Sequence, residues 1–222
     1  MFHDYRDNLT FLHNTLSPKV YLEIGVETGR SLVLANKETS AIGVAPNPII
    51  SEDLDSNKTV FDMTSDDFFA QKAEEVLQNR KIDLAFIDGM HNFDFVLRDF
   101  INVEKNCNPK SIIAVHDIFP ADEVSSRRIR ETIFWTGDVF KFVLIIKKYR
   151  PDLKFYNSDI GPAGLAIISN LDPKSTVLKD NYNSIVEEFI DYPYDNLLPY
   201  KRDILSINSD NGYQDFVNQI LN

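Results

Sequence analysis

The stretch KIDLAFIDGMHNFDFVLRDFINVEKN, residues 81–106, joins a strand directly to a helix. Residues 81–88 are largely apolar, as expected for a strand that is covered on both faces. From 92 to 106 the apolar side chains fall near one helical face, at Phe93, Val96, Leu97, Phe100, Ile101 and Val103. A buried strand followed at once by an amphipathic helix predicts a β–α unit of a parallel sheet.

The same alternation extends on both sides of this unit. Further strands are expected at 20–25, 40–45, 59–63, 111–117, 153–159 and 164–170, the last two as an antiparallel, hairpin-like pair. Helices are expected at 4–16, 26–37, 65–80 and 135–150, and near 181–191 and 212–221. Ser65 is the expected N-cap of the helix at 65–80, and Asn108-Pro109 is expected to form a turn. The pattern predicts an α/β, doubly wound, mostly parallel sheet with helices on both faces.

Length and composition favour a single well-filled domain. The chain has 222 residues, of which 43% are hydrophobic and 16 are Phe, enough for a substantial core. We expect the main domain at residues 1–173, with an N-terminal helix within 1–18. Residues 174–222 are polar and rich in Asn, Asp and Tyr, and are expected to form a helical extension packed on the same domain.

The charge of the chain bears on its partners. A net charge of −11 disfavours nucleic acid and anionic membranes, because both repel an acidic protein, and the densest basic patch, at Arg127, Arg128 and Arg130, is small. The single cysteine, Cys107, excludes an internal disulfide. The N-terminal residues lack the apolar core of a secretory signal, and no window approaches about 18 apolar residues, so a cytoplasmic location is expected.

Mostly polar residues gather at the carboxyl ends of five predicted strands, which is where ligands bind in doubly wound sheets. In strand order these residues are Glu23, Gly25, Glu27, Thr28, Gly29 and Ser31; Ala45, Pro46 and Asn47; Asp62, Met63, Ser65 and Asp66; Asp88, Gly89 and His91; His116 and Asp117. One such end is common at a protein surface. Five at one edge of the sheet predict a ligand-binding cleft.

The turn after the first strand, LEIGVETGRS at 22–31, carries glycines four residues apart, at Gly25 and Gly29. Glycine there lets the backbone turn sharply and approach a ligand closely. The turn lacks the third glycine of a dinucleotide fingerprint, and Glu27 would repel a pyrophosphate. A nicotinamide-dependent dehydrogenase is therefore disfavoured, and a ligand with a cationic end is favoured.

These residues resemble a known family. Glu23-x-Gly25-x-x-x-Gly29 resembles motif I of class I S-adenosylmethionine-dependent methyltransferases. The Asp88-Gly-x-His91 turn, the Arg98-Asp99-Phe100 helix, the His116-Asp117 strand end and the segments 135–141, 150–153 and 164–168 resemble its Methyltransferase-24 group. The resemblance runs from about residue 20 to 173. It implies a Rossmann-like sheet of seven strands and S-adenosylmethionine as cofactor.

The resemblance also implies a set of cofactor-binding residues. The methionine end would lie on the first turn, at Glu23, Gly25, Glu27, Thr28, Gly29 and Ser31, the ribose at Ala45, and the adenine near Ser65 and Asp66, with Asp88 also beside the cofactor. The family usually has an acidic residue at the position of Ala45, and losing its charge-assisted hydrogen bond would cost roughly 1.5–3 kcal/mol. Glu52, Asp53 and Asp55 in the following loop are candidate replacements.

In metal-dependent O-methyltransferases of this type, acids at the fourth and fifth strand ends hold Mg²⁺ and a histidine acts as general base. By position, the resemblance makes His91 the base and Asp88, His116 and Asp117 the residues that hold Mg²⁺ or another divalent cation. Mg²⁺ prefers oxygen, so Asp88 and Asp117 are the better ligands. His116 would orient a ligand, bind a softer ion or act as the base itself.

The function expected from these residues is methyl transfer from S-adenosylmethionine to a hydroxyl of a small molecule, a sugar or a secondary metabolite, with a divalent metal assisting. The alternative is a non-catalytic or differently liganded binding module that has lost the ribose-binding acid at Ala45. A homodimer is compatible with either interpretation.

Some residues also have plain structural interpretations. Asp88-Gly89 is compatible with ordinary turn chemistry. His3 and His13 are expected to be solvated or partly packed. Trp135 is expected in the core, with a lid over the acceptor pocket as its alternative. Arg98 and Asp99 are expected to form an ion pair on a helix face.

Overall fold

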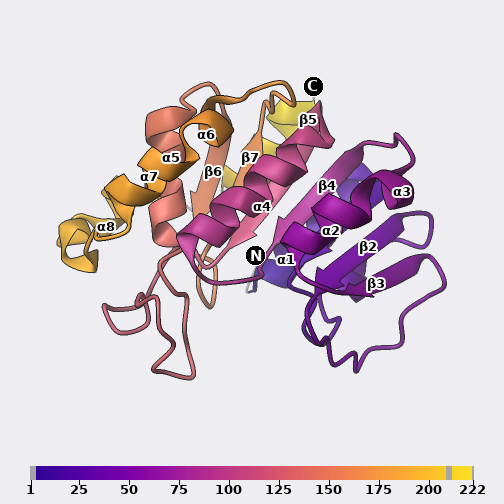
Figure 1. The fold of residues 1–222 in the computed structure, drawn as a ribbon, viewed down its shortest axis with the longest axis horizontal. Coiled ribbons are helices and arrows are strands. Elements are labelled where there is room, and N and C mark those ends of the chain that lie inside the picture. Colours follow the sequence, from indigo (N-terminus) through magenta and orange to yellow (C-terminus); the bar gives the residue numbers. More distant parts are fainter. Residues whose placement is uncertain (1–3, 209–211, 222) are drawn as a thin grey trace.

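The computed structural model describes residues 4–208 and 212–221. Its centre is a seven-stranded sheet in the order β3-β2-β1-β4-β5-β7-β6 (Figure 1). The strands are β1 (Val20–Ile24), β2 (Ser40–Ala45), β3 (Lys58–Asp62), β4 (Ile82–Ile87), β5 (Cys107–His116), β6 (Lys154–Ser158) and β7 (Leu165–Ser169). All pairings are parallel except those of β7, which runs antiparallel to β5 and β6. The predicted doubly wound fold is confirmed.

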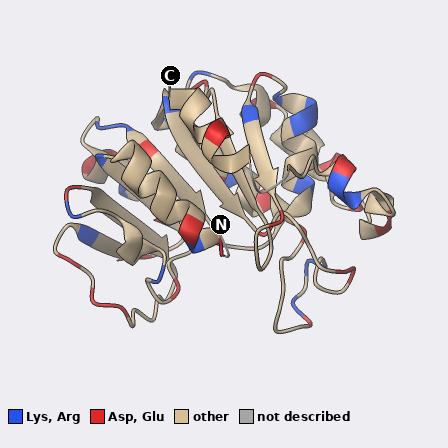
Figure 2. Cartoon of the chain, turned by 180° about the vertical axis from the view of Figure 1, so that it is seen from behind, with Lys and Arg blue, Asp and Glu red and all other residues tan. Residues whose placement is uncertain are grey.

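The side chains of each strand alternate between two apolar layers. On β1, Leu22 and Ile24 point to a layer covered by α2 (Ser65–Gln71), α3 (Ala73–Leu77), α4 (Phe93–Lys105) and α5 (Phe140–Tyr149). Tyr21 points to the opposite layer, covered by α1 (Tyr5–Leu16), the short 3₁₀ helix η1 (Leu32–Leu34) and α9 (Tyr213–Leu221). Charged residues lie mainly in the loops and on the helices (Figure 2).

The strand order places a switch point between β1 and β4. From β1 the chain proceeds outward to β2 and β3, and it then returns to add β4 and β5 on the other side. The loops after β1 and β4 therefore lie where a ligand-binding crevice is expected in a doubly wound sheet. The glycine turn and Asp88 follow these two strands.

The helix expected at 26–37 is absent from the described chain. Only η1 forms there, because Glu27 and Gly29 adopt positive φ angles of 45° and 90° that no helix accommodates. Ser31 donates its hydroxyl hydrogen to Glu23, so it does not cap a helix. Leu9 and Leu12 of α1 pack into the same apolar layer as Leu32 and cover this face instead.

Three element boundaries also differ from expectation. The helix expected at 65–80 breaks at Lys72 into α2 and α3, and its N-cap is Thr64, whose hydroxyl accepts the Asp67 N–H. Strand β5 begins at Cys107, so Asn108-Pro109 lies at an irregularity inside the strand rather than in a turn. Helix α5 begins at Phe140 rather than 135, because Gly137 has a φ of 56°.

The chain after β7 wraps around both faces of the sheet (Figure 1). Helices α6 (Val177–Asp180) and α7 (Tyr182–Phe189), the 3₁₀ helix η2 (Tyr194–Leu197) and α8 (Lys201–Ile204) lie on the α5 side. Helix α9 returns to the opposite face, where the Tyr213 hydroxyl donates to the Asn8 carbonyl at 3.1 Å. Among the helices described, none is long and apolar enough to cross a membrane.

His13 is fully buried, which corrects the expectation of a solvated or partly packed side chain, whereas His3 lies outside the described residues. The imidazole of His13 packs edge-on against the ring of Tyr21, with 4.5 Å between the ring centroids. Neither of its ring nitrogens has a hydrogen-bond partner within residues 4–208 and 212–221. Burial, followed by the charge of Lys58, lowers the pKa of His13 to about 4. The folded chain therefore holds this imidazole neutral.

His13 should make the fold sensitive to mild acid. Its pKa is lower in the folded chain than in the unfolded chain, so stability is complete above about pH 6.5 and falls as the pH drops toward about 4. His13→Phe, which keeps the aromatic contact, should remove this dependence. Urea unfolding should show the variant gaining about 1.4 kcal/mol over the wild type between about pH 7.5 and about pH 5.5. Parallel pH profiles of the two proteins would contradict the assignment.

Candidate active site at the carboxyl ends of β1, β4 and β5

The backbones that leave β1 and β4 touch at Gly25 and Asp88. The Asp88 N–H donates to the Ile24 carbonyl at 2.8 Å, and Gly25 has a φ of 96°. A Cβ on Gly25 would lie 2.0 Å from the Asp88 carbonyl oxygen, so the space admits only glycine. This contact fixes the position of the Asp88 backbone and therefore of its Cα.

Four ionisable side chains converge beyond β4 and β5. His116 Nδ1 lies 3.1 Å from Asp88 Oδ1 and 3.5 Å from Asp117 Oδ2. His91 Nε2 lies 3.1 Å from Asp117 Oδ2 and 3.6 Å from Asp88 Oδ1. Asp117 has a φ of 64°, a conformation that aspartate tolerates better than most residues, and it directs the carboxylate back toward the cluster. The structure thus brings together the four residues that the sequence singled out at these strand ends.

The loop between β5 and α5 holds the imidazole of His91. The His91 Nδ1 lies 2.9 Å from the Trp135 carbonyl oxygen, and the indole stacks on the imidazole at 5.1 Å with 20° between the rings. Gly137 lies so close that a Cβ there would be 1.6 Å from the His91 carbonyl oxygen. Trp135 is therefore a half-buried neighbour of His91 in a loop, not the core helix residue that was expected.

The charges in this cluster control one another. Burial disfavours the imidazolium form of His91, but the hydrogen bond to Asp88 and the charges of Asp117 and Asp88 outweigh it and raise the pKa to about 9. Burial is likewise outweighed at His116, where Asp88 and Asp117 raise the pKa to about 10. Burial alone would raise the pKa of Asp88, yet the two imidazoles hold it well below its usual range. As the side chains stand, the imidazoles neutralise the carboxylates.

Three of these residues can hold a metal ion. Asp88, His116 and Asp117 each offer a ligand atom, and these atoms lie within 4.8 Å of one another. That span suits one ion with bonds of about 2.0–2.6 Å. Asp117 Oδ2 is buried and receives no hydrogen bond from the described chain, although His91 lies nearby. A buried carboxylate oxygen without a donor is a suitable ligand for a cation.

Tyr5, the first residue of α1, covers the His116 side of the cluster, whereas Trp135 covers the His91 side. Asp4 caps α1 by accepting the Arg6 N–H, and this cap places Tyr5 in the first turn. The Tyr5 ring lies 4.3 Å from the ring of His116 and 5.7 Å from that of Phe86. Burial, followed by the charge of Asp88, raises the pKa of Tyr5 well above its usual range. The phenol therefore stays neutral beside the cluster.

The glycine turn is internally bonded and covered by the loop after β2. Glu23 is buried and accepts hydrogen bonds of 2.7 Å from the hydroxyls of Tyr21 and Ser31. Burial raises the pKa of Glu23 to about 8, so its carboxyl is largely protonated at neutral pH. The carbonyls of Glu27 and Thr28 accept hydrogen bonds of 2.9 and 3.1 Å from the amides of residues 49 and 51.

Ala45 ends β2 with its side chain almost fully buried. Its register partner on β3 is Asp62, whose Oδ1 accepts the Asn47 N–H at 2.7 Å. Of the three acids in the following loop, Asp55 pairs with Lys58 at 3.2 Å and Asp53 is exposed. Glu52 is different, because its Cβ lies 3.6 Å from the position that a Cβ on Gly29 would occupy. The loop thus returns Glu52 to the glycine turn.

The residues near the expected adenine site form unexpected pairs. Arg98 binds Asp66 through two hydrogen bonds of 3.0 and 3.2 Å, so Arg98 does not pair with Asp99 as expected. Asp99 is buried and hydrogen-bonded to Ser65, and burial raises its pKa to about 7. Its carboxylate also lies 3.8 Å from the position that a Cβ on Gly89 would occupy. Asp99 therefore faces the site from α4.

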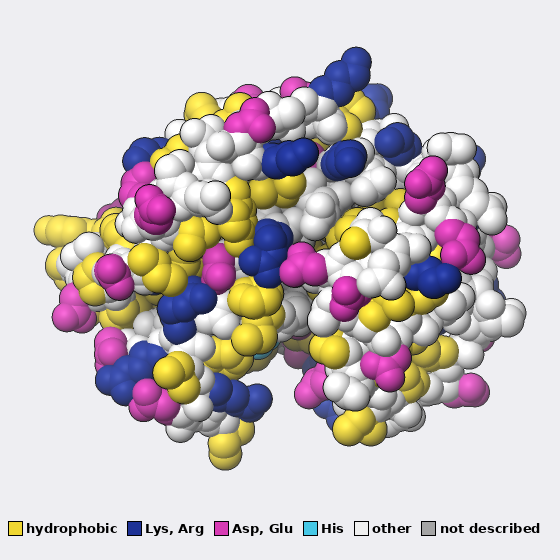
Figure 3. All heavy atoms as spheres, in the orientation of Figure 1, with side chains coloured by type: hydrophobic (Ala, Val, Ile, Leu, Met, Phe, Trp, Pro, Cys, Tyr) yellow, Lys and Arg dark blue, Asp and Glu magenta, His cyan; other side chains and the backbone are white. Residues whose placement is uncertain are grey.

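Figure 3 shows a hollow at the lower edge of the molecule, between the loop after β5 and the loop after β2, with a histidine side chain visible inside. Exposed apolar side chains belong to the loops at this edge. Ile129 and Ile133 on one loop are 75% and 95% exposed, Ile49 on the other is 78% exposed, and Met90 of the turn after β4 is 50% exposed. The hollow therefore has an ionisable floor and an apolar rim.

Sequence reasoning missed several residues around the cluster. Tyr5 reaches it from a segment distant in sequence, and no local pattern marks it, whereas Trp135 was placed over the acceptor pocket only as an alternative. Asp99 was detectable in principle, because it lies among apolar positions of the α4 pattern, between Leu97 and Phe100. Gly137, at the start of a predicted helix, was a further signal that the helix begins later.

Gly25→Ala should be far more harmful than Gly29→Ala. Both glycines have positive φ, which costs alanine about 1–2 kcal/mol, but only Gly25 lies against a backbone carbonyl. We expect Gly29→Ala to lose about 1–2 kcal/mol of unfolding free energy and Gly25→Ala to lose at least about 3 kcal/mol. Urea unfolding of both variants measures the difference. Equal losses would mean that the turn can move away from Asp88.

Comparisons with known proteins relate the chain to methyltransferases. Residues 22–118 match the Methyltransferase-24 family model, described as a methyltransferase domain. No curated protein sequence matches the chain. Among solved structures, an O-methyltransferase from Bacillus cereus in complex with S-adenosylhomocysteine has a TM-score of 0.54 at 16% identity, over 76% of this chain and 83% of that one.

Two further structures are similar. The S-adenosylmethionine complex of an O-methyltransferase of tomaymycin synthesis from Streptomyces achromogenes has a TM-score of 0.57 at 14% identity, over 74% of this chain and 78% of that one. A Podospora anserina methyltransferase bound to S-adenosylhomocysteine has a TM-score of 0.59 at 14% identity, over 76% and 78%. These likenesses show that the chain has the fold of these methyltransferases, and residues 22–118 are similar to the family model of a methyltransferase domain.

Proposed function

We propose that this protein transfers a methyl group from S-adenosylmethionine to a hydroxyl of a small molecule. The observation that carries the proposal is the convergence of Asp88, His91, His116 and Asp117 beside the glycine turn, at the switch point of the sheet. The match to a methyltransferase model supports methyl transfer as the reaction, and an imidazole–carboxylate cluster is suited to removing a proton from a hydroxyl.

His91 is the proposed general base. Its Nδ1 faces the Trp135 carbonyl oxygen, so that Nε2 is directed toward Asp117 and Asp88, where an acceptor hydroxyl would bind. The two carboxylates keep this imidazole protonated at neutral pH. It can accept a proton only when those charges are engaged elsewhere.

A divalent cation is the natural partner for the two carboxylates. Bound there, it would lower the pKa of an acceptor hydroxyl. Asp88 and Asp117 would supply oxygen ligands and His116 a nitrogen ligand, a mixed set that suits Mn²⁺, Fe²⁺ or Zn²⁺ as well as Mg²⁺. With Asp88 and Asp117 so engaged, the pKa of His91 would fall and the imidazole would be free to act.

The rim of the hollow favours one acceptor class over the other. A sugar offers mostly hydroxyl groups, whereas Ile49, Met90 and Ile133 offer exposed apolar side chains around the cluster. An acceptor with an apolar body and one reactive hydroxyl would bury these side chains on binding. We therefore favour a secondary metabolite over a sugar.

The competing hypothesis is a binding module that has lost the cofactor. It is motivated by Ala45, which removes the usual ribose contact, and by Asp66, whose carboxylate is bound to Arg98 rather than free to meet an adenine. Under this hypothesis the glycine turn and the β5 edge would serve another ligand.

Calorimetric titration with S-adenosylhomocysteine, with and without Mg²⁺ or Mn²⁺, tests the proposed function. We expect dissociation constants of about micromolar order, and we expect added Mn²⁺ to bind the wild type but not Asp117→Asn. An absence of binding at about millimolar ligand would reject the enzyme and leave the binding module. Cofactor binding without any metal binding would reject metal assistance only.

Glu52 is the proposed replacement for the missing ribose acid, because the loop returns it to the glycine turn. Glu52→Gln should weaken binding of S-adenosylhomocysteine about tenfold, as expected for losing a charge-assisted hydrogen bond. Asp53→Asn removes the same charge from the exposed neighbouring position and is the matched control, with an expected change of less than about twofold. Equal effects of the two variants would show that Glu52 acts only through its charge or not at all.

A further inference from the structure

Asp138 lies at the junction between the loop after β5 and the first turn of α4, and it is 1% exposed. Its Oδ1 accepts the Phe93 N–H at 2.9 Å, one of the amides that a helix N-terminus leaves without an internal partner. The N-cap residue Asn92 makes no side-chain capping bond to the described helix, and it donates instead to the Arg128 carbonyl. Asp138 therefore caps α4 from another part of the chain.

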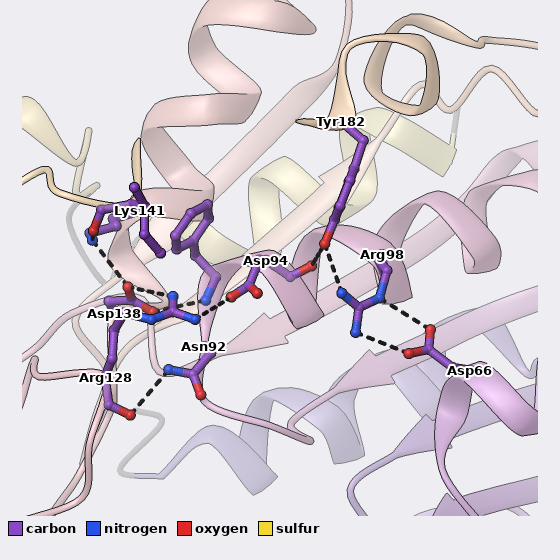
Figure 4. A network of polar contacts seen from close by, with 10 residues as sticks. Asp66, Asn92, Asp94, Arg98, Arg128, Asp138, Lys141 and Tyr182 are labelled. Carbon is purple, nitrogen blue, oxygen red and sulfur yellow. Dashed lines mark hydrogen bonds and ion pairs between the residues drawn. The ribbon is translucent and has the colours of Figure 1, made fainter. Parts of the chain in front are cut away.

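The charge of Asp138 is shared with two cations from different elements (Figure 4). Its Oδ2 lies 2.9 Å from Arg128 of the loop and 3.1 Å from Lys141 of α5. Arg128 also binds Asp94 of α4 at 2.8 Å, and its guanidinium lies 5.4 Å from the ring of Phe93. Breaking a buried pair of this kind leaves an uncompensated charge, so the group holds its three elements in one arrangement.

The residues just before Asp138 are those that hold His91. Gly137 packs against the His91 carbonyl, and Trp135 supplies both the stacked ring and the carbonyl oxygen that Nδ1 faces. Only two residues, Thr136 and Gly137, lie between Trp135 and the anchor at Asp138. A loop this short cannot keep the indole in place if its anchor is released.

Thr136, between Trp135 and Asp138, is buried and bonds within the loop, where its N–H and hydroxyl donate to the Ser125 carbonyl at 3.0 and 3.1 Å. A cavity of about 470 Å³ borders Arg128, Asp138 and Lys141, so water can reach the ion pairs as soon as they separate. Trp135 is half-buried, and its Nε1 donates only within the loop, to the Arg127 carbonyl at 2.6 Å. Arg128 also ties the loop to α4 through Asp94 and Asn92, but Asp138 is the link that lies closest to Trp135 in sequence.

We propose that Asp138 is a positioning residue for the reactive cluster, because it anchors the Trp135–Gly137 segment that holds the imidazole of His91. Its role in catalysis rests on the proposed function, but the anchoring itself does not. Loss of the anchor should let the indole leave the imidazole and let the ring of His91 rotate, while the glycine turn on the other side of the crevice keeps its shape.

The experiment uses Trp135 as its probe, since it is the only tryptophan of the chain. In Asp138→Ala we expect emission at longer wavelength, an acrylamide quenching constant raised about twofold, and a shifted ¹⁵N resonance of His91 Nδ1. Arg98→Ala is the matched control. It removes an arginine of α4, the helix that Asp138 caps, and this arginine binds Asp66 and Tyr182 rather than the loop. The substitution should leave all three signals unchanged.

An Asp138→Ala variant that folds and keeps the wild-type signals would overturn the proposal and leave Asp138 as a helix cap only. If that variant does not fold, Asp138→Asn decides, because it keeps an acceptor for the Phe93 N–H and loses only the charge. Unchanged signals in Asp138→Asn would then overturn the proposal. None of these signals needs cofactor or acceptor, so they stand whether or not wild-type protein binds S-adenosylhomocysteine.

Discussion

The close contact between the backbones at Gly25 and Asp88 is the constraint on which the candidate site depends. It allows the turn after β1 and the turn after β4 to leave the sheet side by side, with no side chain between them. The expected cofactor site and the ionisable cluster are therefore neighbours because of one missing Cβ. Any wider separation at this point would detach the glycine turn from the carboxylate that faces it.

The cluster itself is stable only as a group. Two carboxylates in a largely buried space repel each other, and each imidazole alone would prefer to be neutral there. Together they form alternating contacts of 3.1–3.6 Å between opposite charges. Tyr5 and Trp135 then cover the rings of His116 and His91 from two sides. Each of these aromatic residues comes from outside the strands that carry the cluster.

The sequence predicted the parts of the fold that hydrophobic periodicity controls. Seven strands, the helix at 93–105 and the convergence of Asp88, His91, His116 and Asp117 followed from apolar runs and from the geometry of parallel strands. The helix expected after β1 did not form, because positive φ angles at Glu27 and Gly29 outweigh helix propensity. Both residues contact the loop after β2, at Ile49 and Glu52, and no local window of sequence contains these contacts.

The residues that were misassigned share one physical cause. Trp135 was expected in the core, and Arg98 and Asp99 were expected to form an ion pair on a helix face. Adjacent residues on a helix point in different directions, so Arg98 meets Asp66 on the surface while Asp99 is buried. Partner choice depends on which elements pack against each face of α4, and only the folded chain shows that.

The end of β2 and the ends of β4 and β5 provide different evidence about function. At the end of β2 the chain has Ala45 where the resemblance led us to expect an acid, and both a binding module and an enzyme with a different ribose contact would tolerate this residue. At β4 and β5 it keeps four ionisable groups close together, two of them almost fully buried, at a cost in desolvation that better-packed apolar residues would avoid. Acids and imidazoles that shift one another's pKa values cluster at catalytic sites more often than at sites that only bind a ligand. The cluster at the ends of β4 and β5 therefore favours an enzyme over a binding module. Ala45 at the end of β2 affects only how a cofactor would be held.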